Sequence, residues 1–278
     1  MSRPFLKMNG LGNDFAVVDA RKNAFDPAPD QIRAWSDRAR GIGFDQLIAI
    51  EDAKDGDAFM RVWNADGGSV ETCGNALRCV AYMLNPTADD KRLTIDTLGG
   101  KTVARVLEAN ARTGMASVDM GKPGLDWRDI PLAEEMNTNR LELKVGPYDA
   151  PLYHTPAAVS MGNPHCVFFV DDVALVDVRA AGSLLEFHPL FPEATNVEFA
   201  QVIDKKTIRM RVWERGAGIT KACGTGACAT LVATARRGLT GREAEVIMDG
   251  GPLHIVWRDD DHVIMTGPVE VEFQGELP

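Results

Sequence analysis

Two cysteines, Cys73 and Cys223, stand in the same local sequence 150 residues apart. Residues 60–75 read MRVWNADGGSVETCGN, and residues 210–225 read MRVWERGAGITKACGT. In each copy an apolar strand and a glycine-containing turn precede the cysteine, and a stretch with helical spacing follows it. The positive end of a helix dipole and its free backbone N–H groups stabilise a thiolate. We therefore expect a depressed pKa at both thiols.

Two equivalent thiols suit the inversion of a stereocentre. A thiolate can remove a proton from one face of a carbon while a thiol returns a proton to the opposite face. The α-hydrogen of an amino acid is only weakly acidic, so the substrate carboxylate needs help from hydrogen-bond donors in a dry site. The backbone N–H groups at the two helix starts can supply it. They belong to Gly74, Asn75, Gly224 and Thr225.

Polar side chains recur with the same spacing and are candidates for binding the substrate. Three pairs lie 150 residues apart: Asn13 with Asn163, Gln46 with Asn196, and Asn64 with Glu214. Together with Arg215 they suit the amino group and the second charged end of a substrate. His165 and Glu214 are also candidates for setting which thiol is ionised.

The repeat runs along nearly the whole chain, which indicates two copies of one fold unit. We expect an α+β fold of two pseudo-symmetric domains, residues 1-123 and 124-269, each a curled sheet around a central helix. The C-terminal strand 270-278 is a candidate for returning to the first domain. Further expected elements include a helix from Asp30, as its cap, to Arg40, and a strand around Leu141 to Val145.

Composition excludes several classes of function. The 278 residues are 45% hydrophobic and 25% charged, and the net charge is -10, so a nucleic-acid surface is not expected. There is no signal-peptide core and no apolar run long enough to span a membrane, which predicts a cytoplasmic protein. The five cysteines are an odd number in a large chain and are expected to be reduced.

The remaining cysteines, Cys79, Cys166 and Cys228, lie among apolar neighbours and are expected to be core residues. Their spacing from Cys73 and Cys223 is not that of a zinc site. Neither a metal cluster nor a lysine motif for pyridoxal phosphate is apparent, so we expect no metal and no cofactor.

Seven motifs in this sequence resemble those of the diaminopimelate epimerase family, in order and along essentially the whole chain. They are MNGLGNDF, GFDQ, NADGGSVETCGNALRC, MGNPHCV, HPLFPEATNVEF, WERGAGITKACGTGA and GPVEVEF. The resemblance implies a cofactor-independent two-base epimerase that interconverts LL- and meso-2,6-diaminopimelate in lysine and peptidoglycan precursor biosynthesis. It also implies a small-molecule amino-acid substrate and a homodimer.

Carried over by motif, the resemblance makes Cys73 and Cys223 the catalytic pair, with His165 and Glu214 tuning their pKa values. It implies substrate contacts at Asn13, Gln46, Asn64, Gly74, Asn75, Asn163, Asn196, Glu214, Arg215, Gly224 and Thr225. Two positions depart from the family pattern. Ala76 replaces a glycine at the helix start, and Phe273 stands where a dimer-contact tyrosine is expected.

Two alternatives remain open. A proline or hydroxyproline racemase similarly uses two cysteines in this fold, although Glu214 and Arg215 argue against proline, which has no distal charged end. A non-catalytic thiol-switch binding protein would instead join Cys73 and Cys223 in a regulatory disulfide.

Overall fold

The computed structural model describes residues 3–147 and 149–277 and divides the chain into two units. Unit 1 contains Met1–Asp119 and Thr266–Pro278, and unit 2 contains Met120–Met265. The expected domains end at 123 and 269 instead, so each boundary falls slightly earlier in the structure than the sequence suggests.

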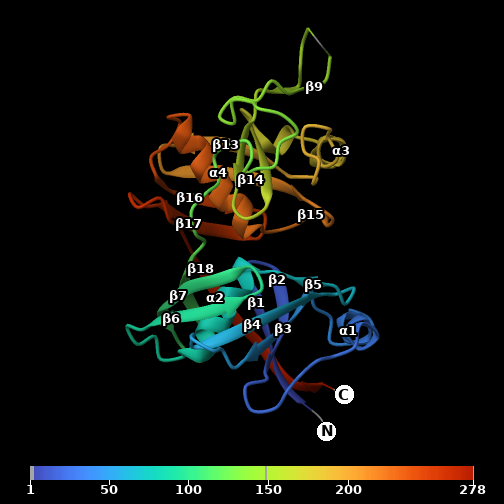
Figure 1. The fold of residues 1–278 in the computed structure, drawn as a ribbon, viewed down its shortest axis with the longest axis vertical. Coiled ribbons are helices and arrows are strands. Elements are labelled where there is room, and N and C mark those ends of the chain that lie inside the picture. Colours follow the sequence, from blue (N-terminus) through green and yellow to red (C-terminus); the bar gives the residue numbers. More distant parts are fainter. Residues whose placement is uncertain (1–2, 148, 278) are drawn as a thin grey trace. The chain divides into compact units, whose positions relative to one another are not determined.

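Unit 1 is a sheet wrapped around helix α2 (Gly74–Leu84) (Figure 1). The strands follow the order β1-β2-β3-β4-β6-β7-β8-β18, and β18 also pairs with β1, which closes the sheet into a ring. Helix α2 contacts β1, β2, β6, β7 and β8, so it lies inside the ring. The strands are β1 (Arg3–Gly10), β2 (Asn13–Asp19), β3 (Gln46–Glu51), β4 (Ala58–Asn64), β5 (Ser69–Val70), β6 (Arg92–Thr97), β7 (Gly100–Ala109), β8 (Thr113–Asp119) and β18 (Val263–Leu277).

Unit 2 repeats this plan around helix α4 (Gly224–Arg236). Its two sheet edges are joined through the segment 120–124, where Met120 N–H donates to Val263 O and Gly124 exchanges two backbone hydrogen bonds with Ser160. Helix α3 (Val178–Leu185) and the 3-10 helix η1 (Val173–Leu175) pack outside the ring. The strands are β9 (Lys144–Val145), β10 (Tyr153–His154), β11 (Ala157–Ser160), β12 (Pro164–Phe169), β13 (Asn196–Asp204), β14 (Thr207–Glu214), β15 (Gly218–Ile219), β16 (Glu243–Met248) and β17 (Gly251–Trp257).

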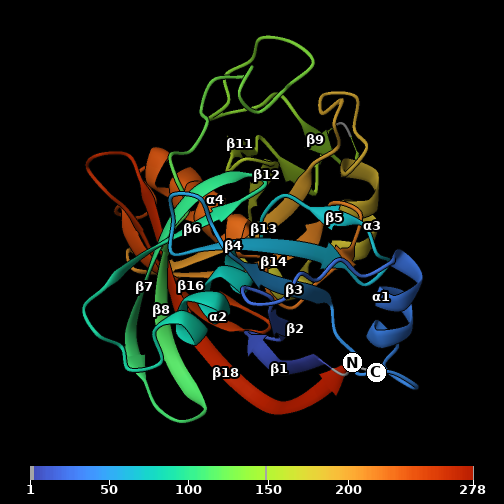
Figure 2. The same ribbon diagram turned by 60° about the horizontal axis from the view of Figure 1, so that its bottom comes forward.

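Strand register confirms the internal duplication. In unit 1 the parallel pair β2–β3 aligns Phe15 with Gln46, and in unit 2 the parallel pair β12–β13 aligns His165 with Asn196. The next pairing is antiparallel in both units, and the one after it is parallel in both. The predicted α+β fold of two related units, each a curled sheet around a central helix, is therefore correct (Figure 2).

Two local predictions were wrong. Helix α1 (Pro29–Ser36) has Ala28 as its N-cap rather than Asp30, because Pro29 occupies the first helical position. It also ends four residues before Arg40, since the chain turns back and the Ile42 N–H donates to Trp35 O. Only Lys144–Val145 of the expected strand at 141–145 is a strand, because the partner segment leaves the extended conformation at Thr155 (φ 50°) and continues with Pro156, which has no N–H to donate.

A close contact between α3 and β14 gives a test of the packing in unit 2. A Cβ on Gly182 would lie 2.4 Å from the Cβ of Trp213, well inside van der Waals contact. Gly182→Ala should therefore destabilise the protein by about 1–3 kcal/mol in urea unfolding, even though alanine favours a helix. Gly241→Ala is the matched control, because nothing lies within 4 Å of its added Cβ. Equal stability of the two variants would contradict this packing.

Candidate active site

The two repeated cysteines occupy the same place in the two units, as predicted. Cys73 is the N-cap of α2 and Cys223 is the N-cap of α4, and both have an extended backbone. Gly74 and Gly224 are the first helical residues. Each thiol thus stands at the start of the enclosed helix, where backbone N–H groups lack intrahelical acceptors.

Three of the predicted side chains gather at the Cys73 end of unit 1. The Cys73 Sγ lies 3.9 Å from Asn13 Oδ1, and Asn75 Nδ2 donates to the same oxygen at 3.3 Å. Cys73 is half-buried, whereas Asn75 is buried. The substituted Ala76 is fully buried within α2, so its methyl group is accommodated in the packing.

The remaining polar residues share one edge of each sheet. Asn13 begins β2, Gln46 begins the parallel strand β3, and Asn64 ends the antiparallel strand β4. Strand direction therefore brings these ends together, and Gln46 Nε2 donates to Asn64 Oδ1 at 3.0 Å. In unit 2 the same edge holds Asn163, Asn196 and Glu214.

The surroundings of Cys223 overturn the expected low pKa at this position. Cys223 is only 4% exposed. Burial, followed by the carboxylates of Glu214 and Glu198, raises the pKa of the Cys223 thiol well above its usual value. The opposing donors are weaker: Gly226 N–H donates to Sγ at 3.4 Å, and Thr225 Oγ1 lies 3.6 Å from it. The helix start does not outweigh burial and like charge.

The predicted binding residues near Glu214 are tied to the turn after β14. Thr220 Oγ1 donates to the Glu214 carboxylate. The Arg215 backbone N–H donates to Asn196 Oδ1 at 3.0 Å, and the Arg215 guanidinium donates to Glu193 O at 2.9 Å. The buried Asn196 side chain therefore holds the turn in place, whereas Arg215 is exposed.

His165 lies in a buried network with Glu198, a residue that was not predicted from the sequence. Its Nδ1 lies 2.6 Å from Glu198 Oε1, and its Nε2 lies 3.0 Å from Asn163 Oδ1. The sequence did hold a signal for Glu198: it lies two residues after Asn196 on β13, on the same side of the strand, and it is the charged residue among the apolar residues Val197, Phe199 and Ala200.

Unit 1 contains two further residues that were missed. Arg78 is fully buried in α2 and donates to Asn75 Oδ1 at 3.0 Å. Asp45 Oδ2 accepts from Asn13 Nδ2 at 3.0 Å. Arg78 is the sole charged residue in the apolar sequence of α2, which is the signal that could have identified it.

The other three cysteines are buried, as predicted. Burial raises the pKa of Cys79 to about 12, and it also raises the pKa of Cys166 well above the ordinary thiol value. Within residues 3–147 and 149–277, no group of three or more His, Cys, Asp or Glu side chains is placed to hold a metal ion. None of the helices in this described part is long and apolar enough to cross a membrane.

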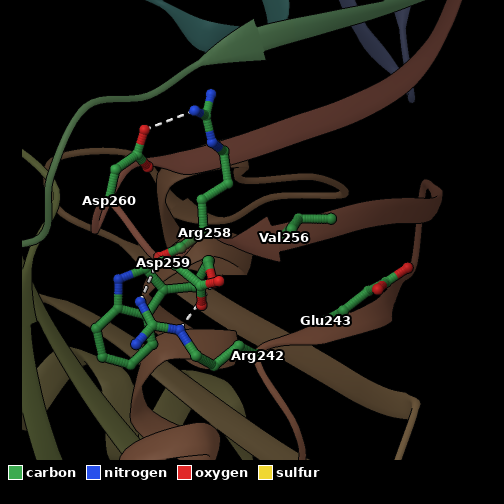
Figure 3. A pocket seen from close by; sticks show the side chains of 7 residues that line it. Arg242, Glu243, Val256, Arg258, Asp259 and Asp260 are labelled. Atoms are coloured by element: carbon green, nitrogen blue, oxygen red, sulfur yellow. Dashed lines mark hydrogen bonds and ion pairs between the residues drawn. The ribbon is translucent and has the colours of Figure 1, made fainter.

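A hollow at the edge of β16 and β17 lies outside this constellation (Figure 3). Its charged groups mostly satisfy one another: the Arg242 guanidinium stacks 3.9 Å from the Trp257 ring centroid, and Arg258 pairs with Asp260 at 2.5 Å. None of the predicted site residues lines it. The cysteine-bearing helix starts remain the candidate active site.

Several solved structures share this architecture. A predicted epimerase from Pseudomonas aeruginosa superposes with a TM-score of 0.69 at 18% identity, covering 99% of both chains. A hydroxyproline epimerase from Agrobacterium vitis, with bound trans-4-hydroxy-L-proline, gives 0.70 at 15% identity over 99% of this chain and 90% of its own. The chain therefore has the fold of this epimerase class.

Sequence similarity gives the family within that class. The family model described as Diaminopimelate epimerase matches residues 5–125 and 157–272. Proteins named diaminopimelate epimerase from Caulobacter vibrioides and Phenylobacterium zucineum are each 55% identical over 100% of this chain, and cover 98% and 99% of their own lengths. This chain belongs to the diaminopimelate epimerase family.

The two cysteines should differ in reactivity. At pH 8 iodoacetamide should label Cys73 well before Cys223, since Cys223 is buried and its raised pKa keeps it a thiol. Glu214→Gln should speed labelling of Cys223, because it removes one carboxylate that raises that pKa. Peptide mass spectrometry measures both rates, and buried Cys79 is the internal control. Labelling of Cys223 ahead of Cys73 would contradict this environment.

Proposed function

We propose that this protein interconverts LL- and meso-2,6-diaminopimelate without a cofactor, in lysine and peptidoglycan precursor biosynthesis. The observation that carries the proposal is the repeated placement of Cys73 and Cys223 as N-caps of two enclosed helices, in a chain whose full length matches this family. Other enzymes of the fold class act on other substrates, so the substrate assignment depends on the family rather than on the fold.

In the proposed reaction the substrate enters with one cysteine as thiolate and the other as thiol. The thiolate takes the α-proton, the C–H electron pair stays on carbon, and the thiol delivers its proton to the opposite face. Each turnover thus inverts the centre and exchanges the charges of the two sulfurs. The raised pKa of Cys223 supports Cys223 as the thiol and Cys73 as the thiolate before the first turnover.

The carbanion is the difficult species, and we assign its stabilisation to backbone donors. Free N–H groups at the starts of α2 and α4 suit the substrate carboxylate, whose oxygens take up charge as the proton leaves. They belong to Gly74, Asn75, Gly224 and Thr225. We assign recognition of the amino group and the distal end to Asn13, Gln46, Asn64, Asn163, Asn196, Glu214 and Arg215.

We also propose that the protein is a homodimer in the cytoplasm. Phe273 is 45% exposed and packs edge-to-face on Phe5, with ring centroids 6.0 Å apart. An exposed aromatic ring beside buried apolar surface supports a contact between subunits at this place, even without the hydroxyl group of the expected tyrosine.

Proton NMR of LL-diaminopimelate in deuterated water tests the reaction directly. With reduced protein, the α-proton signal should disappear and the meso isomer should appear, while L-proline should keep its α-proton. Exchange with proline alone would favour the proline-racemase alternative. Exchange with neither compound, together with a Cys73–Cys223 disulfide on oxidation, would favour the thiol-switch alternative.

Each cysteine should be indispensable for epimerisation. Cys73→Ala and Cys223→Ala should each lower kcat by at least about a thousandfold, because one of the two proton-transfer groups is lost. Cys228→Ala, a buried cysteine within α4, is the control and should retain substantial turnover. Turnover near the wild-type rate by either Cys73→Ala or Cys223→Ala would rule out the two-base mechanism.

A further inference from the structure

The pair formed by His165 and Glu198 is the most deeply buried ionisable cluster in the described part of unit 2. Both side chains have an exposed fraction of 0%, and Nδ1 and Oε1 are 2.6 Å apart. The pair lies beside the reactive thiol: a Cβ on Gly226 would stand 2.9 Å from Glu198 Oε1 and 3.2 Å from Cys223 Sγ. Its protonation therefore matters to the site.

The number of protons on this pair follows from its burial. Glu198 Oε2 has no hydrogen-bond partner in the described part of the chain. An ionised Glu198 beside a neutral imidazole would be an uncompensated charge in a dry site, which costs several kcal/mol. A neutral pair avoids this cost, either as imidazolium with carboxylate or as imidazole with carboxylic acid. Burial, which raises the pKa of Glu198, acts in the same direction.

Both neutral arrangements have the same consequence for the far side of the ring. If the shared proton sits on Nδ1 or on Oε1, the second proton sits on Nε2 of His165, because on Glu198 Oε2 it would be a buried donor with no acceptor in the described part of the chain. Nε2 then donates to Asn163 Oδ1 at 3.0 Å. This fixes the orientation of the Asn163 amide and leaves its NH2 group, which has no other partner among the described residues, for a ligand.

In unit 1 the oxygen of the counterpart asparagine, Asn13, also accepts a hydrogen bond from a side chain, but from a different residue. Arg78 can only donate, so it requires the oxygen of Asn75 to face it, and Asn75 Nδ2 then donates to Asn13 Oδ1. At the other end of this series of hydrogen bonds, the Asp45 carboxylate can only accept, and Asn13 Nδ2 donates to it. Asn13, the counterpart of Asn163, is therefore also held by its oxygen, and one N–H of its amide remains available.

The two units use different residues for this purpose. Phe15 stands where unit 2 has His165, and Ile48 stands where it has Glu198. Conversely, Cys228 stands where unit 1 has Arg78. In both units the oxygen of the repeated asparagine accepts from a side chain, which supports a role for its NH2 group in binding a ligand.

We propose that Glu198 is a positioning residue that, through His165, holds Asn163 with its NH2 group directed to an acceptor on the ligand. The acceptor that suits such a donor is a carboxylate oxygen of an amino acid. The identity of that ligand rests on the proposed function, whereas the state of the His165–Glu198 pair does not.

The protonation of the pair can be measured without any substrate. In a long-range proton–nitrogen spectrum of protein labelled with 15N-histidine, the Nε2 of His165 should appear as a protonated nitrogen at pH 7.5. His165→Gln identifies the signal by its loss. A bare Nε2 at this pH would overturn the proposal, even in a protein with full epimerase activity.

A double-mutant cycle tests the route through Asn163. Glu198→Leu leaves no polar group at Nδ1 to hold the ring or to fix which nitrogen carries its single proton, so it should raise KM for diaminopimelate by up to about tenfold, the value of one hydrogen bond. In an Asn163→Ala background the same change should raise KM less than about twofold, because the group it positions is gone. Glu245→Leu, on an exposed part of β16, is the matched control and should leave KM unchanged.

Three results would overturn the proposal. One is an equal rise in KM in both backgrounds, as expected of general damage to unit 2. The second is a lowered kcat with unchanged KM, which would place the effect of Glu198 on Cys223 alone. The third is an unchanged KM in a folded Glu198→Leu protein. If the wild-type protein epimerises nothing, the proposed function fails, and the nitrogen spectrum still decides the state of the pair.

Discussion

The enclosure of one helix by a closed sheet is the constraint on which the rest of each unit depends. A helix inside such a ring cannot turn its first N–H groups to bulk water along its sides, so these donors must be satisfied at the open end of the ring. The structure places a cysteine and a glycine there in both units. A site that offers N–H donors and a thiol together is the direct result.

The same enclosure opposes the chemistry that the helix start favours. A helix N-terminus stabilises a thiolate, but removal from water destabilises it. In unit 2 burial and two carboxylates outweigh the helix, and the pKa of Cys223 is raised. Cys73 is more exposed, and its Sγ lies 3.9 Å from the amide oxygen of Asn13. The duplicated motif therefore holds two unlike thiols.

Much of the fold could be predicted from the sequence because its signals are local or repeated. The repeat gave two related units, and the periodicity after each cysteine gave the enclosed helices. The errors fall where distant contacts decide. Trp35 O accepts from Ile42 N–H and ends α1 early, and the expected strand at 141–145 is short because its partner segment turns at Thr155 and Pro156. No pattern within either segment reports these partners.

The candidate site could likewise be predicted only in part from the sequence. Residues in the repeated motifs could be placed at strand and helix ends, since strand direction alone brings Asn13 and Gln46 to one edge. The electrostatics could not be obtained in this way, because the pKa of Cys223 depends on Glu198, which is 25 residues away in sequence and reaches the thiol only through folding. The residues next to a cysteine can indicate a helix start, but they do not indicate how deeply the thiol is buried.

Divergence between the two copies favours one of the two singly ionised states that a two-base reaction uses. With identical surroundings, the two sulfurs would have equal pKa values, and neither singly ionised state would be preferred. Carboxylates near Cys223 favour the state in which that sulfur keeps its proton. Because turnover exchanges the charges, this bias has to be small enough to reverse once the substrate carries the developing negative charge. A neutral pair of His165 and Glu198 suits this requirement, because the shared proton weakens the influence of the Glu198 carboxylate on Cys223 and leaves Glu214 as the larger influence of the two.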